Sequence, residues 1–316
     1  MYFTGSKDHN VVLRTMAKKR GIKINEYGLF KGSRKIACAD EAEIYEKLGL
    51  HYIPPELREN TGEIDAARAA DPPELVSEKD IRGTFHVHST YSDGVTPLEA
   101  MILEAERMGL EYVGISDHSQ SAKYAKGLEP ERLRIQWKEI DAIQKRVKIR
   151  IFKGIESDIL ADGALDYPES VLKQFDFVIG SIHSKFNLPE KEMTERIRRA
   201  MDNPHLTFVG HPTGRLLLAR VGYAVNIPAL IDHAAKTGVV MELNANPHRM
   251  DLDWRVLPLA KRKKVLISIN PDAHSLEGMR DITYGVGIAR KAGLEKKDVV
   301  NTLPLNAVEK FLKKRK

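Results

Sequence analysis

The stretch GTFHVHSTYSDG, which runs from Gly83 to Gly94, decides how the rest of the chain is interpreted. It opens with an apolar run typical of a buried strand, and His86 and His88 flank Val87 within that run. Because alternate residues of an extended strand face the same side, both histidines can reach one metal ion while Val87 packs on the other side. We therefore predict a strand that carries a pair of metal ligands.

Further residues of metal-ligating type follow along the chain, most of them at or just after the end of a short apolar segment. They are Asp93, His118, Glu156, His183, His211, Asp272 and His274. Neutral imidazole suits zinc, manganese and iron, and a carboxylate can bridge two ions and offset their repulsion. A single histidine is usually a surface residue or a hydrogen-bonded core residue. Nine such residues in these positions indicate a multinuclear metal site.

Seven apolar segments of strand length alternate with helical stretches. The predicted strands are 83–87, 112–116, 149–154, 177–181, 207–210, 239–243 and 265–269, and the helices include 97–108, 130–146, 190–201 and 228–236. Such alternation predicts a parallel sheet covered by helices. An open doubly wound sheet is the alternative to a closed barrel. The barrel is favoured because ligands that come from nearly every strand need a closed rim to converge.

The beginning of the chain indicates a small α+β module with a polarised charge. Ser6 is a candidate N-cap before an apolar stripe at 12–17, Gly21 can end that helix, residues 23–30 are predicted as a strand, and a second helix is expected within 40–49. Residues 1–36 hold nine Lys or Arg and two acidic residues, a net charge of +7, whereas residues 37–76 hold three and ten, a net charge of −7.

Basic clusters such as Lys18–Arg20 and the terminal run Lys313–Lys316 would attract phosphate backbones in a salt-dependent way. Each cluster taken alone is also compatible with a solvated helix face or a disordered tail. No long apolar run or secretory signal opens the chain, so a cytoplasmic location without a membrane partner is expected. Cys38 is the one cysteine, which excludes an intramolecular disulfide.

Several runs of the later sequence resemble the polymerase and histidinol phosphatase (PHP) superfamily. They are GTFHVHSTYSDG at 83–94, ISDHS at 115–119, GIESDI at 154–159 and GSIHS at 180–184. Three more resemble the PHP domain of bacterial and archaeal family X DNA polymerases, namely GHPTGRLLL at 210–218, MELNANPHRMDLDW at 241–254 and INPDAHS at 269–275. Residues 2–30, YFTGSKDHNVVLRTMAKKRGIKINEYGLF, are similar to the palm-to-thumb segment of family X polymerases.

The resemblance implies a distorted seven-stranded β/α (TIM-like) PHP barrel with a small N-terminal α+β thumb-like module. The expected domains are a thumb-like module at 1–60, a linker at 61–79, and a PHP metallo-phosphoesterase domain at 80–316. The boundary is expected within 54–76, where charged and small residues surround the pair Pro72 and Pro73.

The resemblance also assigns the ligands to three divalent ions, manganese or zinc, with iron also compatible. His86, His88, Glu156 and Asp272 would share one ion, Glu156 would bridge to a second held by His183 and His211, and Asp93, His118 and His274 would take the third. Asp117 could orient a ligand from behind or make a structural hydrogen bond. Lys185, Arg215 and Arg249 are candidates for phosphate binding, with ordinary surface or structural salt bridges as the alternative.

The chemistry implied is metal-assisted phosphoester hydrolysis, and no GxSxG nucleophile motif is present. The expected function is a 3′ to 5′ exonuclease or DNA end or abasic-site processing activity in repair. The alternatives are a small-molecule phosphatase of the histidinol phosphatase type and a non-enzymatic module of a split family X polymerase. Because the family's nucleotidyl-transfer carboxylates would precede residue 2, the polymerase palm is expected to be absent. The expected partners are DNA and a separate polymerase chain.

Overall fold

The computed structural model describes residues 1–316 except Tyr2, Cys38, Asp71, Arg315 and Lys316. The chain forms two compact units: unit 1 comprises Met1–Leu75 with Arg290–Gly293, and unit 2 comprises Val76–Ala289 with Leu294–Lys316. The predictions that concern Cys38 and the last two residues of the basic tail fall outside the described residues. No helix in the described part of the chain is both long and apolar enough to cross a lipid bilayer.

Unit 1 is a small α+β fold built on an antiparallel sheet of order β1-β2-β3. Its elements are α1 (Lys7–Lys19), β1 (Lys23–Asn25), β2 (Gly28–Lys31), β3 (Arg34–Ala37), α2 (Glu41–Lys47) and α3 (Glu63–Ala69). Helix α1 begins as predicted, because the side chain of Ser6 accepts a hydrogen bond from the backbone N–H of His9 at 3.2 Å. Asp40 caps α2 in the same way, 2.8 Å from the backbone nitrogen of Glu43.

Two details of unit 1 differ from the sequence prediction. The single strand predicted over 23–30 is a hairpin, in which β1 and β2 pair antiparallel around a turn that Gly28 completes with a φ of 130°. Helix α3 lies inside the stretch 61–79 that was predicted as a linker, and its Ile64 and Ala67 are buried in the core of unit 1. Those two apolar residues explain why this part of the stretch is folded.

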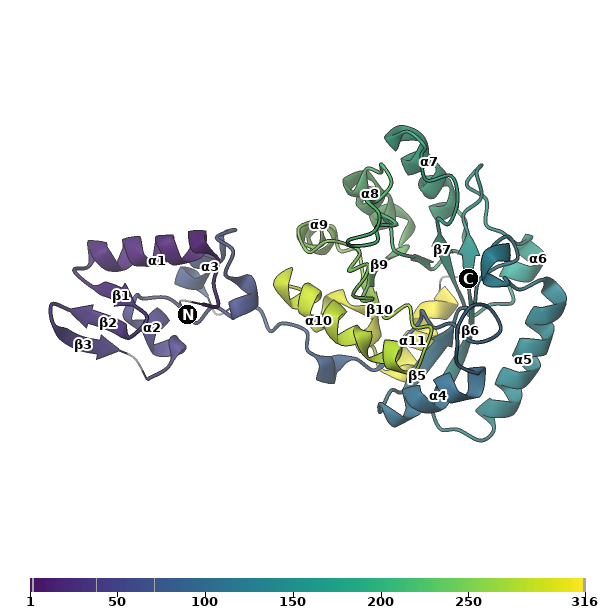
Figure 1. The fold of residues 1–316 in the computed structure, drawn as a ribbon, viewed down its shortest axis with the longest axis horizontal. Helices are drawn as coiled ribbons and strands as arrows, with labels where there is room; N and C mark the ends of the chain where they lie inside the picture. Colours follow the sequence, from purple (N-terminus) through teal and green to yellow (C-terminus); the bar gives the residue numbers. More distant parts are fainter. Residues whose placement is uncertain (2, 38, 71, 315–316) are drawn as a thin grey trace. The chain divides into compact units, whose positions relative to one another are not determined.

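Unit 2 contains seven parallel strands in the order β10-β9-β8-β7-β6-β5-β4. The strands are β4 (Gly83–Thr84), β5 (Tyr112–Ile115), β6 (Arg150–Asp158), β7 (Phe177–Ser181), β8 (Phe208–Val209), β9 (Val240–Asn244) and β10 (Ile267–Asn270). The helices are α4 (Leu98–Arg107), α5 (Pro130–Gln144), α6 (Glu169–Leu172), α7 (Glu190–Met201), α8 (Ile227–Thr237), α9 (Leu257–Arg262), α10 (Ile282–Lys291) and α11 (Leu305–Lys314). Helices surround the strands in Figure 1.

The first and last strands meet, so the sheet is a nearly closed barrel rather than an open sheet. Val87 and Ala273 form an isolated parallel bridge, and the backbone nitrogen of His88 donates to the carbonyl oxygen of Ala273 at 2.8 Å. Regular strand pairing covers only two residues of the predicted strand 83–87, because beyond Thr84 the chain is held by this bridge. The predicted barrel is confirmed, and a structure similar in fold is described below.

An asparagine side chain completes the seam between β4 and β10. Asn301 lies in a short 3-10 helix (Val300–Thr302), and its amide nitrogen donates to the carbonyl oxygens of Gly83 and Ile269 at 3.0 and 2.8 Å. Its amide oxygen accepts from the backbone nitrogen of Ile269 at 2.7 Å. One side chain thus satisfies backbone groups that a neighbouring strand would otherwise pair.

The barrel interior is packed by aromatic side chains, and two glycines make room for one of them. A Cβ atom on Gly154 or Gly114 would lie only 2.1 or 2.6 Å from the ring of Phe177.

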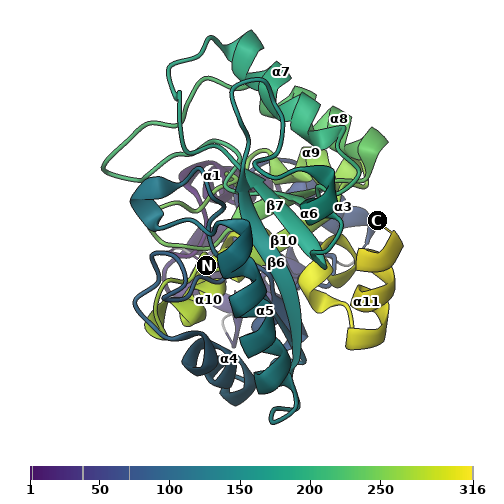
Figure 2. The same ribbon diagram turned by 90° about the vertical axis from the view of Figure 1, so that its right-hand side faces the viewer.

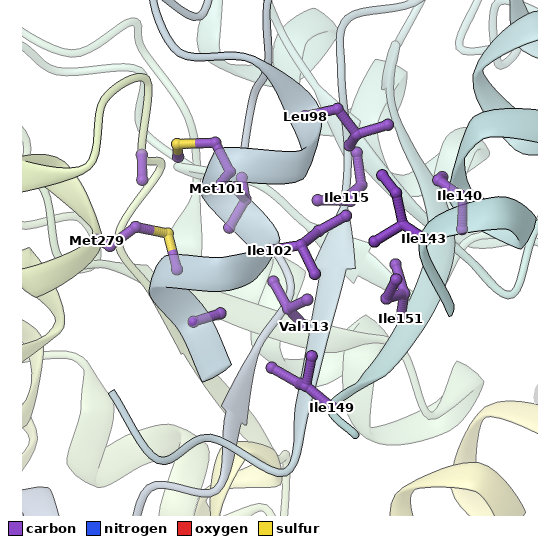
Figure 3. Packing of buried hydrophobic residues seen from close by; sticks show 13 residues of the cluster. Leu98, Met101, Ile102, Val113, Ile115, Ile140, Ile143, Ile149, Ile151 and Met279 are labelled. Atoms are coloured by element: carbon purple, nitrogen blue, oxygen red, sulfur yellow. The ribbon is translucent and has the colours of Figure 1, made fainter. Parts of the chain in front are cut away.

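The outer face of β5 and β6 is covered by α4 and α5, as Figure 2 shows. Figure 3 shows the apolar cluster between them, where Ile102 of α4 and Ile143 of α5 point towards the strands.

Candidate metal centre

The structure brings all nine predicted ligands together at the carboxyl ends of the barrel strands. Four overlapping groups place ligand atoms within 4.8 Å of one another: His88, Asp93, His118 and His274; His86, His88 and Asp272; His86, Glu156 and His211; and His118, Glu156 and His183. Because the groups share members, they form one continuous cluster. Parallel strands explain the convergence, since all their carboxyl ends open on the same side of the barrel.

Two of the ligands sit in unusual backbone conformations. His211 follows β8 with a φ of 24°, and Asp272 follows β10 with a φ of 52°. Residues other than glycine rarely adopt positive φ, and such strained positions concentrate at functional sites. The local backbone is therefore shaped to turn these two side chains towards the cluster.

Glu156 of β6 lies at the middle of the cluster and is almost fully buried. Its two carboxylate oxygens approach five imidazole rings. Oε1 lies 2.9 Å from His211 Nε2, 3.3 Å from His183 Nε2 and 3.4 Å from His86 Nε2, and Oε2 lies 3.0 Å from His118 Nδ1 and 3.5 Å from His88 Nε2. A carboxylate so placed can contact more than one cation at a time.

Asp272 and Asp93 lie on opposite sides of the same cluster. Asp272 Oδ1 lies 3.2 Å from His88 Nε2 and 3.4 Å from His86 Nε2. Asp93 lies towards solvent, with its oxygens 3.3 Å from His274 Nε2 and 3.5 Å from His118 Nε2. The centre therefore has a buried side and a half-exposed side from which a substrate can approach.

Five ring nitrogens of the cluster are buried and have no hydrogen-bond partner among the described residues. They are His86 Nε2, both nitrogens of His88, His118 Nδ1 and His211 Nδ1. A buried polar atom without a partner costs free energy, so native proteins rarely leave several in one place. Imidazole and carboxylate donors in this number fit divalent zinc, manganese or iron, and coordination would satisfy nitrogens that nothing else in the cluster satisfies.

Two acidic residues that the sequence reasoning missed hold ligand rings in place. Glu242 of β9 lies with Oε1 2.6 Å from His86 Nδ1, and Asp158 of β6 lies with Oδ1 2.6 Å from His183 Nδ1. In each ring the Nδ1–H donates to the carboxylate and Nε2 is left facing the cluster. This pairing is frequent behind metal-bound histidines. The sequence signal was an acidic residue inside an otherwise apolar strand, in the runs MELN and GIESD.

The electrostatics of the cluster favour ionised carboxylates. Burial alone would raise the pKa of Glu156, but the rings of His183, His86 and His118 hold that pKa well below its usual range. The same holds for Asp272. Burial would raise its pKa, but His86 and His88 lower it by more, so that the pKa lies well below the usual value. The centre therefore presents carboxylate anions at neutral pH, as cation binding requires.

The histidines are not equivalent. Burial opposes protonation of His183, but Glu156 and Asp158 raise its pKa to about 10. Burial lowers the pKa of His88 to about 3, helped by the neighbouring rings of His274 and His118. His88 is thus held in the neutral form that can donate a lone pair to a cation.

Asp117 binds the loop that follows β4. The sequence left two roles open for it, orienting a metal ligand or making a structural hydrogen bond. It accepts hydrogen bonds from the backbone nitrogen of Ser89 at 2.8 Å, from Ser92 Oγ at 2.5 Å and from Gln136 Nε2 at 2.6 Å. These bonds fix the residues that lead to Asp93. Asp117 therefore positions the loop of a candidate ligand rather than a histidine ring.

The three candidate phosphate-binding residues have different surroundings. Arg249 lies beside the cluster, with Nε 3.3 Å from Asp272 Oδ2 and a buried Nη1 that has no hydrogen-bond partner within the described residues. Arg215 instead binds the backbone, donating from Nε to the carbonyl oxygen of Arg249 at 2.8 Å. Lys185 is exposed and lines a surface cavity that contains none of the nine ligands. Of the three, Arg249 is the one the structure places at the centre.

Family models match most of the chain. The model described as DNA polymerase beta thumb matches residues 1–59, and the model described as PHP domain matches residues 84–246. The chain is 45% identical over 316 residues to the DNA polymerase/3′-5′ exonuclease PolX of Bacillus subtilis strain 168, an alignment that covers 99% of this chain and 55% of that protein. The chain thus spans about half the length of this curated relative.

Other relatives match the second unit. A protein of Thermoanaerobacter sp. strain X514 described as a probable phosphatase is 26% identical over 242 residues, covering 73% of this chain and 91% of that protein. In fold, the chain is similar to the histidinol phosphate phosphatase of Lactococcus lactis solved with zinc, L-histidinol and phosphate. That likeness has a TM-score of 0.51 and 17% identity, and it covers 68% of this chain and 94% of the other.

Proposed function

Because the chain belongs to the PHP domain family, we propose that it is a metal-dependent phosphoesterase that hydrolyses DNA as a 3′ to 5′ exonuclease or processes DNA ends and abasic sites. One observation carries the proposal: nine ligands converge on one cluster whose buried ring nitrogens have no hydrogen-bond partner among the described residues. The similarity of both units to the Bacillus subtilis polymerase and exonuclease supports DNA as the substrate.

The cluster would hold three divalent ions that share ligands. By the PHP family's pattern, His86, His88, Glu156 and Asp272 would hold one, Glu156, His183 and His211 a second, and Asp93, His118 and His274 a third. The ligand atoms that lie within 4.8 Å of one another form overlapping groups of different membership, in which His211 groups with His86 and His183 groups with His118. Manganese and zinc suit this mixed nitrogen and oxygen set, and iron is compatible with it. When bound, such ions lower the pKa of water and stabilise the charge that develops on phosphate oxygens.

The protein's own residues orient the substrate. Arg249 would donate to a non-bridging phosphate oxygen through its unpartnered Nη1, because Asp272 already holds its Nε. Arg215 supports it through the bond to the Arg249 carbonyl oxygen. Lys185 remains a weaker candidate, since it lines a separate surface cavity.

Unit 1 would bind the DNA backbone. The cations of residues 1–36, for example Lys7, Lys18 and Arg20, are exposed in the structure. Their number makes an affinity that falls with salt the expected behaviour, with a slope of about −0.9 in log affinity against log salt for each phosphate contacted on duplex DNA. A separate polymerase chain is a further proposed partner. A role on DNA supports the proposal of a cytoplasmic location.

The test is product analysis with metal-loaded protein. Single-stranded, recessed and abasic DNA labelled at the 5′ end would be incubated beside histidinol phosphate, with Mn²⁺ or Zn²⁺ and with a chelator. Progressive shortening of DNA from the 3′ end, lost with the chelator, is the expected result. His233→Ala is the matched control, because His233 of α8 pairs with Asp202 at 2.7 Å and belongs to none of the four ligand groups.

A small-molecule phosphatase is the second candidate, because relatives described as probable phosphatases match unit 2 over most of their length. Release of phosphate from histidinol phosphate without any shortening of DNA would favour it. Absence of all hydrolysis by fully metal-loaded protein would favour a non-enzymatic module instead.

A further inference from the structure

Several exposed apolar side chains lie in segments that follow the carboxyl ends of barrel strands. Of eight large apolar side chains exposed in the described part of unit 2, three lie on α-helices, namely Leu103, Ile135 and Tyr284. The other five follow the carboxyl ends of barrel strands, four of them in loops and one in a short 3-10 helix. These rim residues are Val95, Tyr124, Leu217, Leu218 and Val221. Single exposed apolar residues are ordinary, but a concentration of them beside a site indicates a bound apolar group.

One rim residue makes a direct backbone contact with a candidate ligand. The backbone nitrogen of Val95 donates to the carbonyl oxygen of His274 at 2.8 Å. Leu217, Leu218 and Val221 belong to the connection between β8 and α8, which also carries His211.

The side chain of Tyr124 lies beside the rings of two predicted ligands. Its ring centroid lies 6.0 Å from the ring of His118 and 6.3 Å from the ring of His183, yet the residue is 69% exposed. The aromatic face of Tyr124 is thus open to solvent and lies close to the rings of His118 and His183. Nothing in the proposed phosphate chemistry uses it.

The segment that carries Tyr124 is anchored to the barrel. Tyr124 lies in a short 3-10 helix (Lys123–Ala125), and its neighbours Ala122 and Ala125 are buried. Ser121 Oγ donates to Asp158 at 2.9 Å, which ties the loop to the carboxylate behind His183. The aromatic face is held in place before any substrate arrives, so stacking on it would cost little ordering.

We propose that Tyr124 stacks on the base of the nucleotide whose phosphodiester lies at the cluster. Every base has a flat π face, so an exposed aromatic ring binds bases with little dependence on sequence. A single sugar separates a base from its phosphate, which matches a ring placed beside the ligands. This inference rests on the proposed function and names the part of DNA that this side of the site reads.

The test uses an oligonucleotide with fluorescent 2-aminopurine at its 3′ end and a phosphorothioate at the last linkage to slow hydrolysis. Binding to the metal-loaded wild-type chain should quench the fluorescence. Tyr124→Ala should lose the quenching, and Tyr124→Phe, which keeps the ring, should retain it. Tyr284→Ala removes an exposed tyrosine on α10 and should behave as wild type.

Kinetics separate a base contact from a structural role. Tyr124→Ala should raise the KM for a 3′ end that carries a base by roughly 5- to 100-fold. The same variant should leave hydrolysis of a 3′ abasic end unchanged, because that end has no base to stack. Equal loss on both ends, or quenching that survives in Tyr124→Ala or is absent in the wild type, would overturn the proposal. Quenching needs no hydrolysis, so it decides this inference even where the proposed nuclease activity fails.

Discussion

Unit 1 and unit 2 both bury histidines, but the hydrogen bonding of the ring nitrogens differs between them. His9 of α1 is fully buried, and both of its ring nitrogens have partners: Nδ1 lies 2.6 Å from Glu63 Oε1, and Nε2 lies 2.9 Å from the Tyr45 hydroxyl. His88 is equally buried, and neither of its nitrogens has a hydrogen-bond partner among the described residues. Burial alone therefore does not mark a functional histidine.

An unpartnered nitrogen is not sufficient either. His205 Nε2 is buried without a hydrogen bond in the described structure, but its nearest carboxylate, Glu169, lies at 3.9 Å and belongs to an exposed side chain. What distinguishes the cluster is that unpartnered nitrogens converge on shared carboxylates. The following predictions test that distinction.

The largest effect is expected from removing one candidate ligand. His86→Ala, or Asp272→Ala, should abolish hydrolysis while the fold is retained, because each side chain lies at the strand ends and outside the apolar core. Turnover, metal content by atomic emission and far-ultraviolet circular dichroism would be measured together, with His9→Ala as the comparison in unit 1. Undiminished turnover at full metal content would contradict the ligand assignment.

A smaller loss is expected from the carboxylates that hold the rings. Glu242→Gln and Asp158→Asn each keep the shape of the side chain but remove the charge behind His86 or His183. Metal affinity should fall by about 10- to 100-fold. Competition with a chelator of known affinity measures this, and unchanged affinity in both variants would mean that the two carboxylates only fill space.

The satisfied histidine of unit 1 should affect stability and not catalysis. His9→Leu leaves Glu63 and the Tyr45 hydroxyl without their partner, at a cost of roughly 1–3 kcal/mol in the free energy of unfolding for each buried group. Urea unfolding followed by tyrosine fluorescence checks the loss. Turnover of bis(p-nitrophenyl) phosphate should stay at the wild-type value, and a fall in it at temperatures where both chains are folded would break the comparison.

Asp251 carries a buried oxygen of a third kind, whose protonation should make the stability of the fold depend on pH. Asp251 Oδ1 is buried without a hydrogen bond in the described structure and belongs to none of the ligand groups, and burial raises the pKa of this carboxyl to about 6. The folded state therefore prefers the neutral acid. Its contribution to stability is complete below about pH 4 and is lost as the pH rises towards 6, a change of about 2–3 kcal/mol.

Asp251→Asn should remove this dependence, since the amide does not ionise. The measurement is the free energy of unfolding in urea at intervals from pH 4 to pH 7, for the wild type and the variant. Identical slopes in both proteins would assign the pH dependence to other groups.

The strands and the residues that converge at their ends could be predicted from the sequence, because both follow from local patterns. Apolar segments such as 112–116 predict strands by their composition, and ligand positions follow from their ends and from the PHP resemblance. The partners of Glu242 and Asn301 could not be predicted, because the closed barrel alone brings them near. Helix α3 was missed because two apolar residues, Ile64 and Ala67, are too few to stand out among charged neighbours.

The seam between β4 and β10, which Asn301 completes, affects the order in which the barrel folds. The hydrogen bond from Asn301 to Gly83 joins residues 218 positions apart, and the bridge from Val87 to Ala273 spans nearly as far. Contacts between such distant residues form late, since a long loop must close before they stabilise anything. During synthesis the first strand therefore leaves the ribosome long before its neighbour across the seam exists. The histidines at its end meet Asp272 only when almost the whole barrel has been translated, so the cluster of candidate ligands is assembled among the last parts of the fold.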